Sequence, residues 1–330
     1  MVRGNAAALN DNRAPFESHD MFASPPSAPV PARHAHLSTR PLLALVFNAG
    51  VWGVSWWPLR RLHEAGLHPL WATASFFMLG TALMLWWRPQ VARLLLGSPA
   101  LWVLAAASGV TNAAFNWAVS TGAVVRVVLL FYLMPLWAVL LARAMLGERI
   151  TPSGLLRVLL GLVGAALVLW PTGVAAQSAW SQLGSLPDAL GVLGGIGFAF
   201  TNVWLRREAE QLPQARAAAM FMGGWMLPCV LGAVLALQGA LPWPPAPAPG
   251  WLLGALGMGL VFVAGNLALQ YGASHLPVNT ASVVMLTEVL FAAASAVWWG
   301  GEVLHPQLLL GGALIMGSAA LAAWQSWASS

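Results

Sequence analysis

The sequence predicts an all-α polytopic membrane protein, with ten transmembrane helices in two inverted five-helix repeats around a central cavity. Three observations support this fold class. The 330-residue chain is 59% hydrophobic and only 8% charged, with a mean hydropathy of +0.72. It contains successive uncharged runs of ~20 residues, enough for a helix to cross a ~30 Å hydrocarbon core with its backbone hydrogen bonds satisfied. The pattern Gly-Glu-x-x-x-Pro occurs at 147–152 and again 154 positions later, at 301–306.

The apolar runs define ten spans, five in each half of the chain. They are 41–62, 67–87, 99–119, 122–146 and 153–171, then 188–206, 213–237, 250–270, 277–299 and 307–327. We therefore expect one repeat over 41–171 and a second, inverted repeat over 188–327. The connections are short, so we expect the function to reside within the bundle or at its mouths.

Residues 1–40 differ in composition from the rest of the chain. They include the Pro/Ala/Ser-rich stretch "ASPPSAPVPAR" and show almost no apolar periodicity, which predicts a disordered cytoplasmic tail. A signal peptide is disfavoured because the first apolar stretch begins near Leu42 and has the length of a full span. The sequence leaves open whether translation starts at Met21.

The distribution of arginine predicts the orientation. All fifteen basic residues are arginine. Nine fall on the side of the tail: Arg33, Arg40, Arg88, Arg93, Arg143, Arg149, Arg206, Arg207 and Arg216. Only Arg60 and Arg61 are clearly opposite, so the positive-inside rule places both termini in the cytoplasm. The net charge of +5 follows from this topology and does not indicate nucleic-acid binding. Lysine-free, Arg/Ala/Gly/Pro-rich usage suggests a GC-rich bacterial genome and an inner-membrane location.

The two halves are weak copies of each other. A shift of 154 pairs Leu136 with Leu290, Ala138 with Ala292, Asn112 with Asn266 and Asn116 with Gln270, and a shift of 146 aligns 52–61 with 198–207. Because five is odd, the second copy enters the membrane from the opposite side, which gives an inverted repeat. Such halves suit alternating access and favour transport. A duplication that only enlarged the bundle is the alternative.

The repeated Gly-Glu-x-x-x-Pro pattern lies between the fourth and fifth helix of each half. Glycine is suited to ending one helix and proline to starting the next. We expect Glu148 and Glu302 to be hydrated carboxylates at the aqueous ends, with no catalytic role.

Further motifs resemble a known family. Trp52-Gly53 in helix 1, "PLWAVLLARAMLGE" (135–148) and its echo "EVLFAAASAVWWGGE" (288–302) resemble EamA-type permeases of the drug/metabolite transporter superfamily. The resemblance covers nearly the whole chain after the tail, and the ten-helix amino-acid exporters are the most similar branch. It implies a cavity lined by helices 1–4 and 6–9, with helices 5 and 10 at the periphery. Val289 stands where the first half has Pro135, which leaves open whether both halves share a helix break.

Polar and aromatic residues within the spans are candidates for substrate binding. They are Asn48, Trp52, Ser55 and Trp56 on one face of helix 1, Asn112 and Asn116 on helix 3, Tyr132 on helix 4, and Asn266 and Gln270 on helix 8. Amides within a span either join helices, at about 1 kcal/mol or less each, or line a wet cavity. The two roles are equally compatible with each residue, and the register match between halves favours the cavity.

Glu288 is the strongest single candidate. A carboxylate at the middle of a span costs roughly 2.5–3.5 kcal/mol, so it should face the bundle interior and have a function. Three roles remain open: a proton carrier, a contact for a substrate amine, or a structural ion pair with Arg126 of helix 4. Arg126 has the alternative of extending to the membrane surface.

Several chemistries are disfavoured by composition. The chain has no lysine for a phosphate loop or Schiff base and a single cysteine, Cys229, so we expect no cofactor, no metal and no enzyme activity. The sequence predicts a secondary exporter of amino acids or related metabolites that works by alternating access, with the lipid bilayer and a small molecule as partners. A channel-like facilitator or a membrane scaffold is the alternative. Cargo, direction, proton coupling, and a monomeric or homodimeric state remain open.

Overall fold

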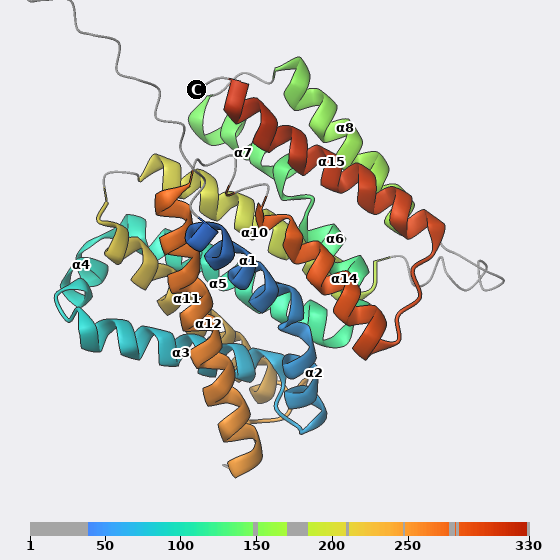
Figure 1. The fold of residues 1–330 in the computed structure, drawn as a ribbon. Helices are drawn as coiled ribbons and strands as arrows, with labels where there is room; N and C mark the ends of the chain where they lie inside the picture. Colours follow the sequence, from blue (N-terminus) through green and yellow to red (C-terminus); the bar gives the residue numbers. More distant parts are fainter. Residues whose placement is uncertain are drawn as a thin grey trace, which may run out of the picture. The chain divides into compact units, whose positions relative to one another are not determined.

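The computed structural model describes residues 39–147, 151–169, 184–208, 211–246, 248–276, 281 and 284–328, and over these ranges it contains helices and no strands (Figure 1). The predicted tail, 1–40, lies outside the described residues except for Thr39 and Arg40, which begin the first helix. Glu148 and the loop 172–183 also lie outside them.

The helices follow the predicted spans. In the first half they are α1 (Thr39–Val54), α2 (Trp56–Glu64), α3 (Pro69–Trp87), α4 (Val91–Gly97), α5 (Pro99–Thr121), α6 (Val124–Phe131), α7 (Met134–Leu146) and α8 (Pro152–Leu169). In the second half they are α10 (Leu186–Arg207), α11 (Pro213–Leu237), α12 (Pro249–His275), α14 (Thr287–Gly300) and α15 (Pro306–Ala328). The predicted spans correspond to one helix or to two consecutive helices, α1–α2 and α6–α7, except that 277–280 and 282–283 of the span 277–299 lie outside the described residues and α14 covers its second part.

Six helical segments of the described chain are long and apolar enough to cross a membrane, or seven if the bent pair α4–α5 counts as one span. The shorter helices α8 and α15 are apolar over 152–168 and 306–321. The predicted all-α, polytopic membrane architecture is confirmed.

The helix boundaries of the repeated pattern are as predicted. Gly147 and Gly301 follow α7 and α14 with φ of 69° and 66°, the left-handed conformation that glycine adopts without a Cβ penalty. Pro152 and Pro306 are the first residues of α8 and α15.

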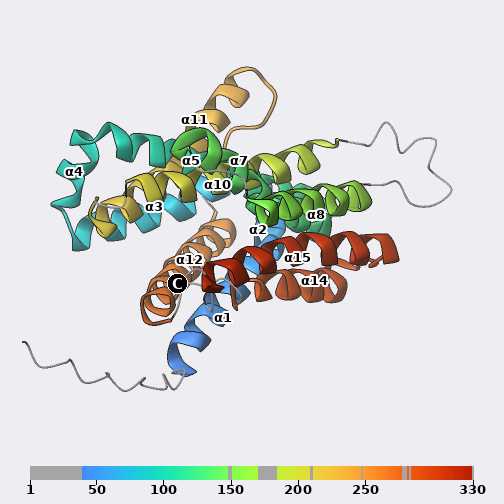
Figure 2. The ribbon, with the colours of Figure 1, turned by 90° about the horizontal axis from the view of Figure 1, so that it is seen from above.

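The contact between α8 and α15 displays the two-fold relation of the halves. A Cβ on Gly164 would lie 2.7 Å from the carbonyl oxygen of Gly311, and one on Gly311 would lie 2.7 Å from that of Gly164. The Ser318 hydroxyl donates to the Arg157 carbonyl over 3.0 Å. Exchanging the halves with the shift of 154 turns the pair Gly164–Gly311 into the pair Ser318–Arg157. The two helices lie side by side at one edge of the bundle (Figures 1 and 2), as the family resemblance implied.

The remaining helices pack mainly across the halves. Helix α5 contacts α10 and α11, and its counterpart α12 contacts α1 and α3. Helix α1 also packs against α14, as α10 does against α6 and α7, and Figure 2 shows α1 beside α12. The centre of the bundle is therefore an interface between the two repeats.

Helix 4 is interrupted, and so is its counterpart. Tyr132 and Leu133 separate α6 from α7, whose second residue is Pro135. In the second half Val284 and Met285 are helical, Leu286 forms a turn, and α14 begins at Thr287. Leu286 is the counterpart of Tyr132 at the shift of 154. The break is thus present in both halves and does not require the proline.

Candidate functional site

The polar face of helix 1, which comprises α1 and α2, is turned toward α14. Asn48 is fully buried, its Nδ2 lies 3.5 Å from the sulfur of Met285, and its Oδ1 has no partner. Trp56 donates through Nε1 to the Ser295 hydroxyl over 2.8 Å, and Ser55 donates to the carbonyl of Trp52 over 2.7 Å. Of these predicted residues, Asn48 and Trp56 thus contact the opposite half directly, whereas the Ser55 hydrogen bond stays in helix 1.

The fourth residue on this face, Trp52, contributes an aromatic surface. Its ring centroid lies 4.7 Å from that of Phe262 and 6.4 Å from that of Phe115, both in edge-on arrangements. These rings come from α12 and α5, so Trp52 packs between helices of both halves.

A glycine brings α1 against the backbone of α14. A Cβ on Gly53 would lie 2.6 Å from the carbonyl oxygen of Glu288 and 2.7 Å from Cβ of Phe291. Any larger residue would push the helices apart. The predicted Trp-Gly of helix 1 therefore positions the first turn of α14, which carries Glu288.

Glu288 meets Tyr132 at the break between α6 and α7. The Tyr132 hydroxyl lies 3.1 Å from Oε2 of Glu288 and 3.3 Å from the carbonyl oxygen of Met285. Glu288 is 8% exposed and Tyr132 is 2% exposed. Because Met285 also contacts Asn48, the four residues Asn48, Tyr132, Met285 and Glu288 form one assembly, called here the central polar cluster.

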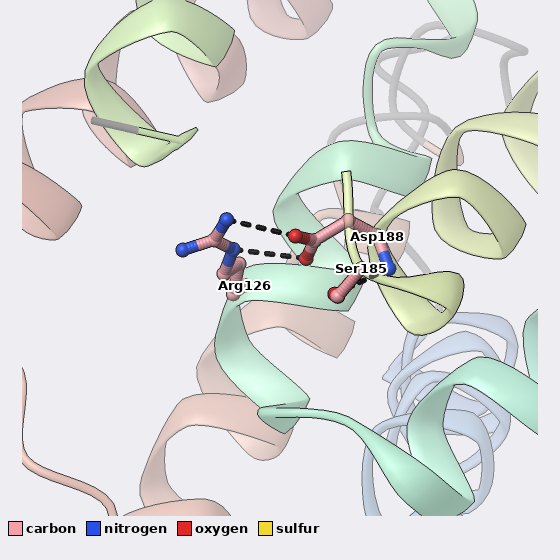
Figure 3. A network of polar contacts seen from close by, with 3 residues as sticks. All are labelled: Arg126, Ser185 and Asp188. Atoms are coloured by element: carbon pink, nitrogen blue, oxygen red, sulfur yellow. Dashed lines mark hydrogen bonds and ion pairs between the residues drawn. The ribbon is translucent and has the colours of Figure 1, made fainter. Parts of the chain in front are cut away.

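An ion pair between Glu288 and Arg126, one of the three roles that the sequence leaves open for Glu288, is not formed. Arg126 instead forms a bidentate pair with Asp188 in the first turn of α10, with Nε–Oδ1 at 2.9 Å and Nη2–Oδ2 at 2.8 Å (Figure 3). The backbone N–H of Asp188 donates to the Ser185 hydroxyl at 3.4 Å. Arg126 and Tyr132 lie at opposite ends of α6, and Glu288 contacts Tyr132, so Arg126 and Glu288 are at different ends of this helix. The Ser-x-x-Asp pattern at 185–188 is typical of a helix start, but it does not indicate that Asp188 pairs with Arg126.

The amides of α5 and α12 do not join the central polar cluster. Asn112 donates to the carbonyl of Ser108 at 2.8 Å, and Asn116, fully buried, donates to Thr73 of α3 at 3.1 Å. Gln270 is exposed and donates to Asn266 at 2.7 Å, within α12. The hydrogen bonds of Asn112 and Asn116 thus link helices of the first half or stay within one helix.

The central polar cluster has an apolar counterpart. At the shifts of 146 and 154, Asn48 corresponds to Gly194, Met285 to Phe131, Tyr132 to Leu286 and Glu288 to Met134. A Cβ on Gly194 would lie 3.3 Å from the Phe131 ring, which is the counterpart of the Asn48–Met285 contact. The same arrangement of helices therefore holds polar side chains at the central polar cluster and aromatic side chains at its counterpart. There the ring centroid of Phe131 lies 4.6 Å from that of Phe115 and 5.5 Å from that of Phe198.

A second polar assembly holds the turn between α5 and α6. The Glu302 carboxylate accepts hydrogen bonds from the backbone N–H groups of Val124, at 2.5 Å, and Val125, at 3.2 Å. The expectation that Glu302 is simply hydrated is wrong, because its carboxylate binds the first N–H groups of α6. These N–H groups have no partner within the helix, and a negative charge at a helix N-terminus interacts favourably with the helix dipole. Arg60 donates to the carbonyls of Gly122, at 2.7 Å, and Val119, at 3.3 Å.

No metal centre is formed by the described residues, since none of their His, Cys, Asp and Glu side chains gather in groups of three or more that could hold an ion.

Comparison with known proteins identifies relatives along most of the chain. Residues 39–170 and 185–324 each match the EamA-like transporter family. An uncharacterized transporter of Archaeoglobus fulgidus is 28% identical over 223 residues, which cover 67% of this chain and 75% of that protein. An uncharacterized transporter of Pseudomonas aeruginosa is 28% identical over 268 residues, covering 76% of this chain and 82% of that protein. A solved crystal structure, at 20% identity, covers 86% of this chain and 96% of its own, with a TM-score of 0.52, and so shares the fold. The predicted resemblance to EamA-type permeases is confirmed.

Proposed function

The chain belongs to the EamA-like transporter family, and from this premise we propose that it is a secondary carrier of small organic solutes that works by alternating access. The cargo class we propose is amino acids or related metabolites, moved outward across a bacterial inner membrane with both chain termini in the cytoplasm. The moving units in this proposal are the two five-helix repeats, 41–171 and 188–327. The protein acts as a carrier and not as an enzyme.

The observation that carries this proposal is the buried carboxylate of Glu288 at the interface of the halves. It comes from α14 of the second half, and its neighbours Asn48 and Tyr132 come from the first half. A carboxylate at this depth needs a compensating donor or charge. Tyr132 supplies one hydrogen bond, and a substrate ammonium group or a proton would supply the rest.

The composition of the cluster favours a ligand with hydrogen-bond donors. Glu288 and the unpaired Oδ1 of Asn48 are acceptors, and Trp52 offers an aromatic face nearby. The amino group of an amino acid has this chemistry, and cation–π contact with Trp52 would add to it. We assign Asn48, Trp52, Tyr132 and Glu288 to substrate binding and proton coupling, and Ser55 and Trp56 to the support of helix 1.

The amides outside the cluster have a different role in this proposal. Asn116 joins α5 to α3 through Thr73, and Asn112 is bonded within α5, so both have structural roles here. The exposed Gln270 and its partner Asn266 remain free to meet a solute in another state of the cycle. Arg126 supports the fold through Asp188 and takes no part in coupling.

The experiment is flux in proteoliposomes loaded with a panel of labelled amino acids, with and without a pH gradient. We expect saturable flux that the gradient changes. In Glu288→Gln the flux should lose its dependence on the gradient, while Glu64→Gln, which changes an exposed carboxylate, should behave as the unaltered protein. Unchanged flux and pH profile in Glu288→Gln would reject proton coupling. Linear, unsaturable flux would instead identify a channel-like facilitator, and no flux of any panel member would reject the amino-acid assignment.

A further inference from the structure

The turn between α5 and α6 is held by charged side chains from three other helices. Arg60, in α2, binds the carbonyls at the C-terminus of α5, and Glu302, just after α14, binds the N–H groups at the N-terminus of α6. Asp188, at the start of α10, binds Arg126 one turn further. Arg60 and Glu302 each meet the helix end of opposite polarity, and Asp188 meets a cation, so the contacts are electrostatically matched.

Helix α6 links this turn to the central polar cluster. It is eight residues long, and all of its residues except Arg126 are buried. Its first turn is bound by Glu302 and the residue after its last turn, Tyr132, is bound by Glu288. These two glutamates flank α14, one in its first turn and one just after its end. The short helix is therefore fastened to α14 at both ends, once at the cluster and once at the turn.

The fastening contacts cross between the repeats at one end of the bundle. Glu302 and Asp188 belong to the second half, and the turn that they hold belongs to the first half. The contacts made by Glu302 and Arg60 are to backbone groups, which water can replace when the helices separate. Arg60 and Glu302 are both half-buried, and Arg60 lines a pocket together with Trp57 and Trp299.

We propose that Glu302 and Arg60 form a gate on the side of the membrane opposite the chain termini, shown here closed, which releases the α5–α6 turn when that side opens. The inference rests on the proposed alternating access and assigns gating residues to it. The Gly-Glu-x-x-x-Pro motif at 301–306, which the sequence predicts to be only a helix boundary, thus also takes part in the transport cycle. The competing interpretation is a permanent helix cap that stays formed in every state.

The test measures access to α6 from each side of the membrane. In a Cys229→Ser background, Val128→Cys places a thiol on the buried face of α6, and a membrane-impermeant thiol reagent is applied to cells and to inverted vesicles. Leu186→Cys, at the exposed start of α10, shows whether this end of the bundle faces the reagent in cells or in inverted vesicles. We expect Glu302→Gln and Arg60→Gln each to raise the labelling rate of Val128→Cys from that side by about tenfold or more, since weakening a charge-assisted contact shifts a two-state equilibrium toward the open form.

The matched control is Glu64→Gln, an exposed carboxylate near Arg60 in sequence that does not bind α6. It should leave the labelling rate unchanged. Labelling that neither gate variant accelerates would overturn the gate, as would equal acceleration by Glu64→Gln.

A second measurement needs no cysteine. Hydrogen exchange at the Val124 and Val125 amides should be faster than in the interior of α6, and faster again in Glu302→Gln. Equal, strong protection throughout α6 in both proteins would show a permanent cap and reject the proposal. Labelling and exchange require no substrate, so they remain informative even if flux experiments reject the proposed cargo or the carrier function.

Discussion

Tyr132 donates a hydrogen bond to Glu288 over 3.1 Å and ties the break of helix 4 to the first turn of α14. Both side chains are buried, and they come from opposite repeats. The pair is therefore a buried polar link between the two repeats, as are the contacts Asn48–Met285 and Trp56–Ser295. The Tyr132–Glu288 contact is a single hydrogen bond from the phenolic hydroxyl, so a substitution that removes only this hydroxyl tests it.

Tyr132→Phe should destabilise the protein and reduce transport. The substitution keeps the ring and removes a donor from a buried carboxylate, which costs about 1–3 kcal/mol. Tyr271→Phe is the matched control, since Tyr271 is the other of the two tyrosines and is 42% exposed. Thermal unfolding in detergent and proteoliposome flux check the prediction. Equal behaviour of the two variants would show that the Tyr132–Glu288 contact contributes little.

Gly164→Ala should loosen the packing of α8 on α15. Its Cβ would lie 2.7 Å from the Gly311 carbonyl oxygen, so the helices must separate, at a cost of roughly 1–3 kcal/mol. Gly317→Ala, in α15, is the control because a Cβ there meets nothing within 4 Å. It should be neutral or stabilising by up to about 1 kcal/mol, from helix propensity alone. Unfolding curves with the opposite order would contradict the proposed packing.

Arg126 and Asp188 should show strong coupling in a double-mutant cycle. Their side chains are 28% and 7% exposed and their pairing is bidentate, so Arg126→Gln leaves a nearly buried carboxylate without its cation. We expect a coupling energy of about 1–3 kcal/mol. The pair Arg61–Glu64, at 63% and 52% exposure, should give less than about 0.5 kcal/mol in the same assay. Comparable values for the two pairs would argue against a structural role for Asp188.

Protonation of His68 should make the protein less stable in mild acid. Burial, with a smaller contribution from the neighbouring His63, lowers the pKa of His68 from 6.5 to about 4. The folded state thus favours neutral histidine, and the unfolded state binds the extra proton between these two pH values. The contribution of His68 to the free energy of unfolding is fully present above pH 6.5. It falls as the pH drops toward 4, by at most about 1.4 kcal/mol per pH unit.

The check is thermal unfolding at several pH values in the unaltered protein and in His68→Asn. Asparagine can still accept the hydrogen bond that Nδ1 of His68 receives from the Leu70 N–H at 3.3 Å, but it does not titrate. The variant should lose less stability between pH 7 and pH 5. Parallel curves for the two proteins would exclude His68 as the source.

Asn112→Ala and Asn266→Ala should separate a structural role of a buried amide from contact with a solute. Asn112 is buried and hydrogen-bonded to Ser108, so its loss should lower the yield of folded protein. Asn266 is half-buried in α12, and its loss should leave folding intact while changing substrate affinity. Equal loss of folded protein in both variants would assign a structural role to both amides.

The regular features of this fold were predictable because they follow from local chemistry. Apolar runs of membrane length, prolines at helix starts and the glycines at 147 and 301 act within a few residues, and the structure has them where the sequence places them. The short helix α4 was missed because seven residues between spans are too few for a periodic pattern. It is fixed by contacts of Val91 and Leu95 with the alanines of α11.

The sequence by itself determined the helical membrane class, the two repeats and the presence of an acidic residue, Glu288, within an apolar run, since hydropathy and internal similarity are properties of the chain alone. Only the tertiary structure decided the partners. It joined Glu288 to Tyr132, Arg126 to Asp188 and Glu302 to the start of α6, because each contact links residues more than sixty positions apart. Such pairings depend on how inverted halves interlock, and a charge in a sequence carries no record of which helix end or side chain will face it.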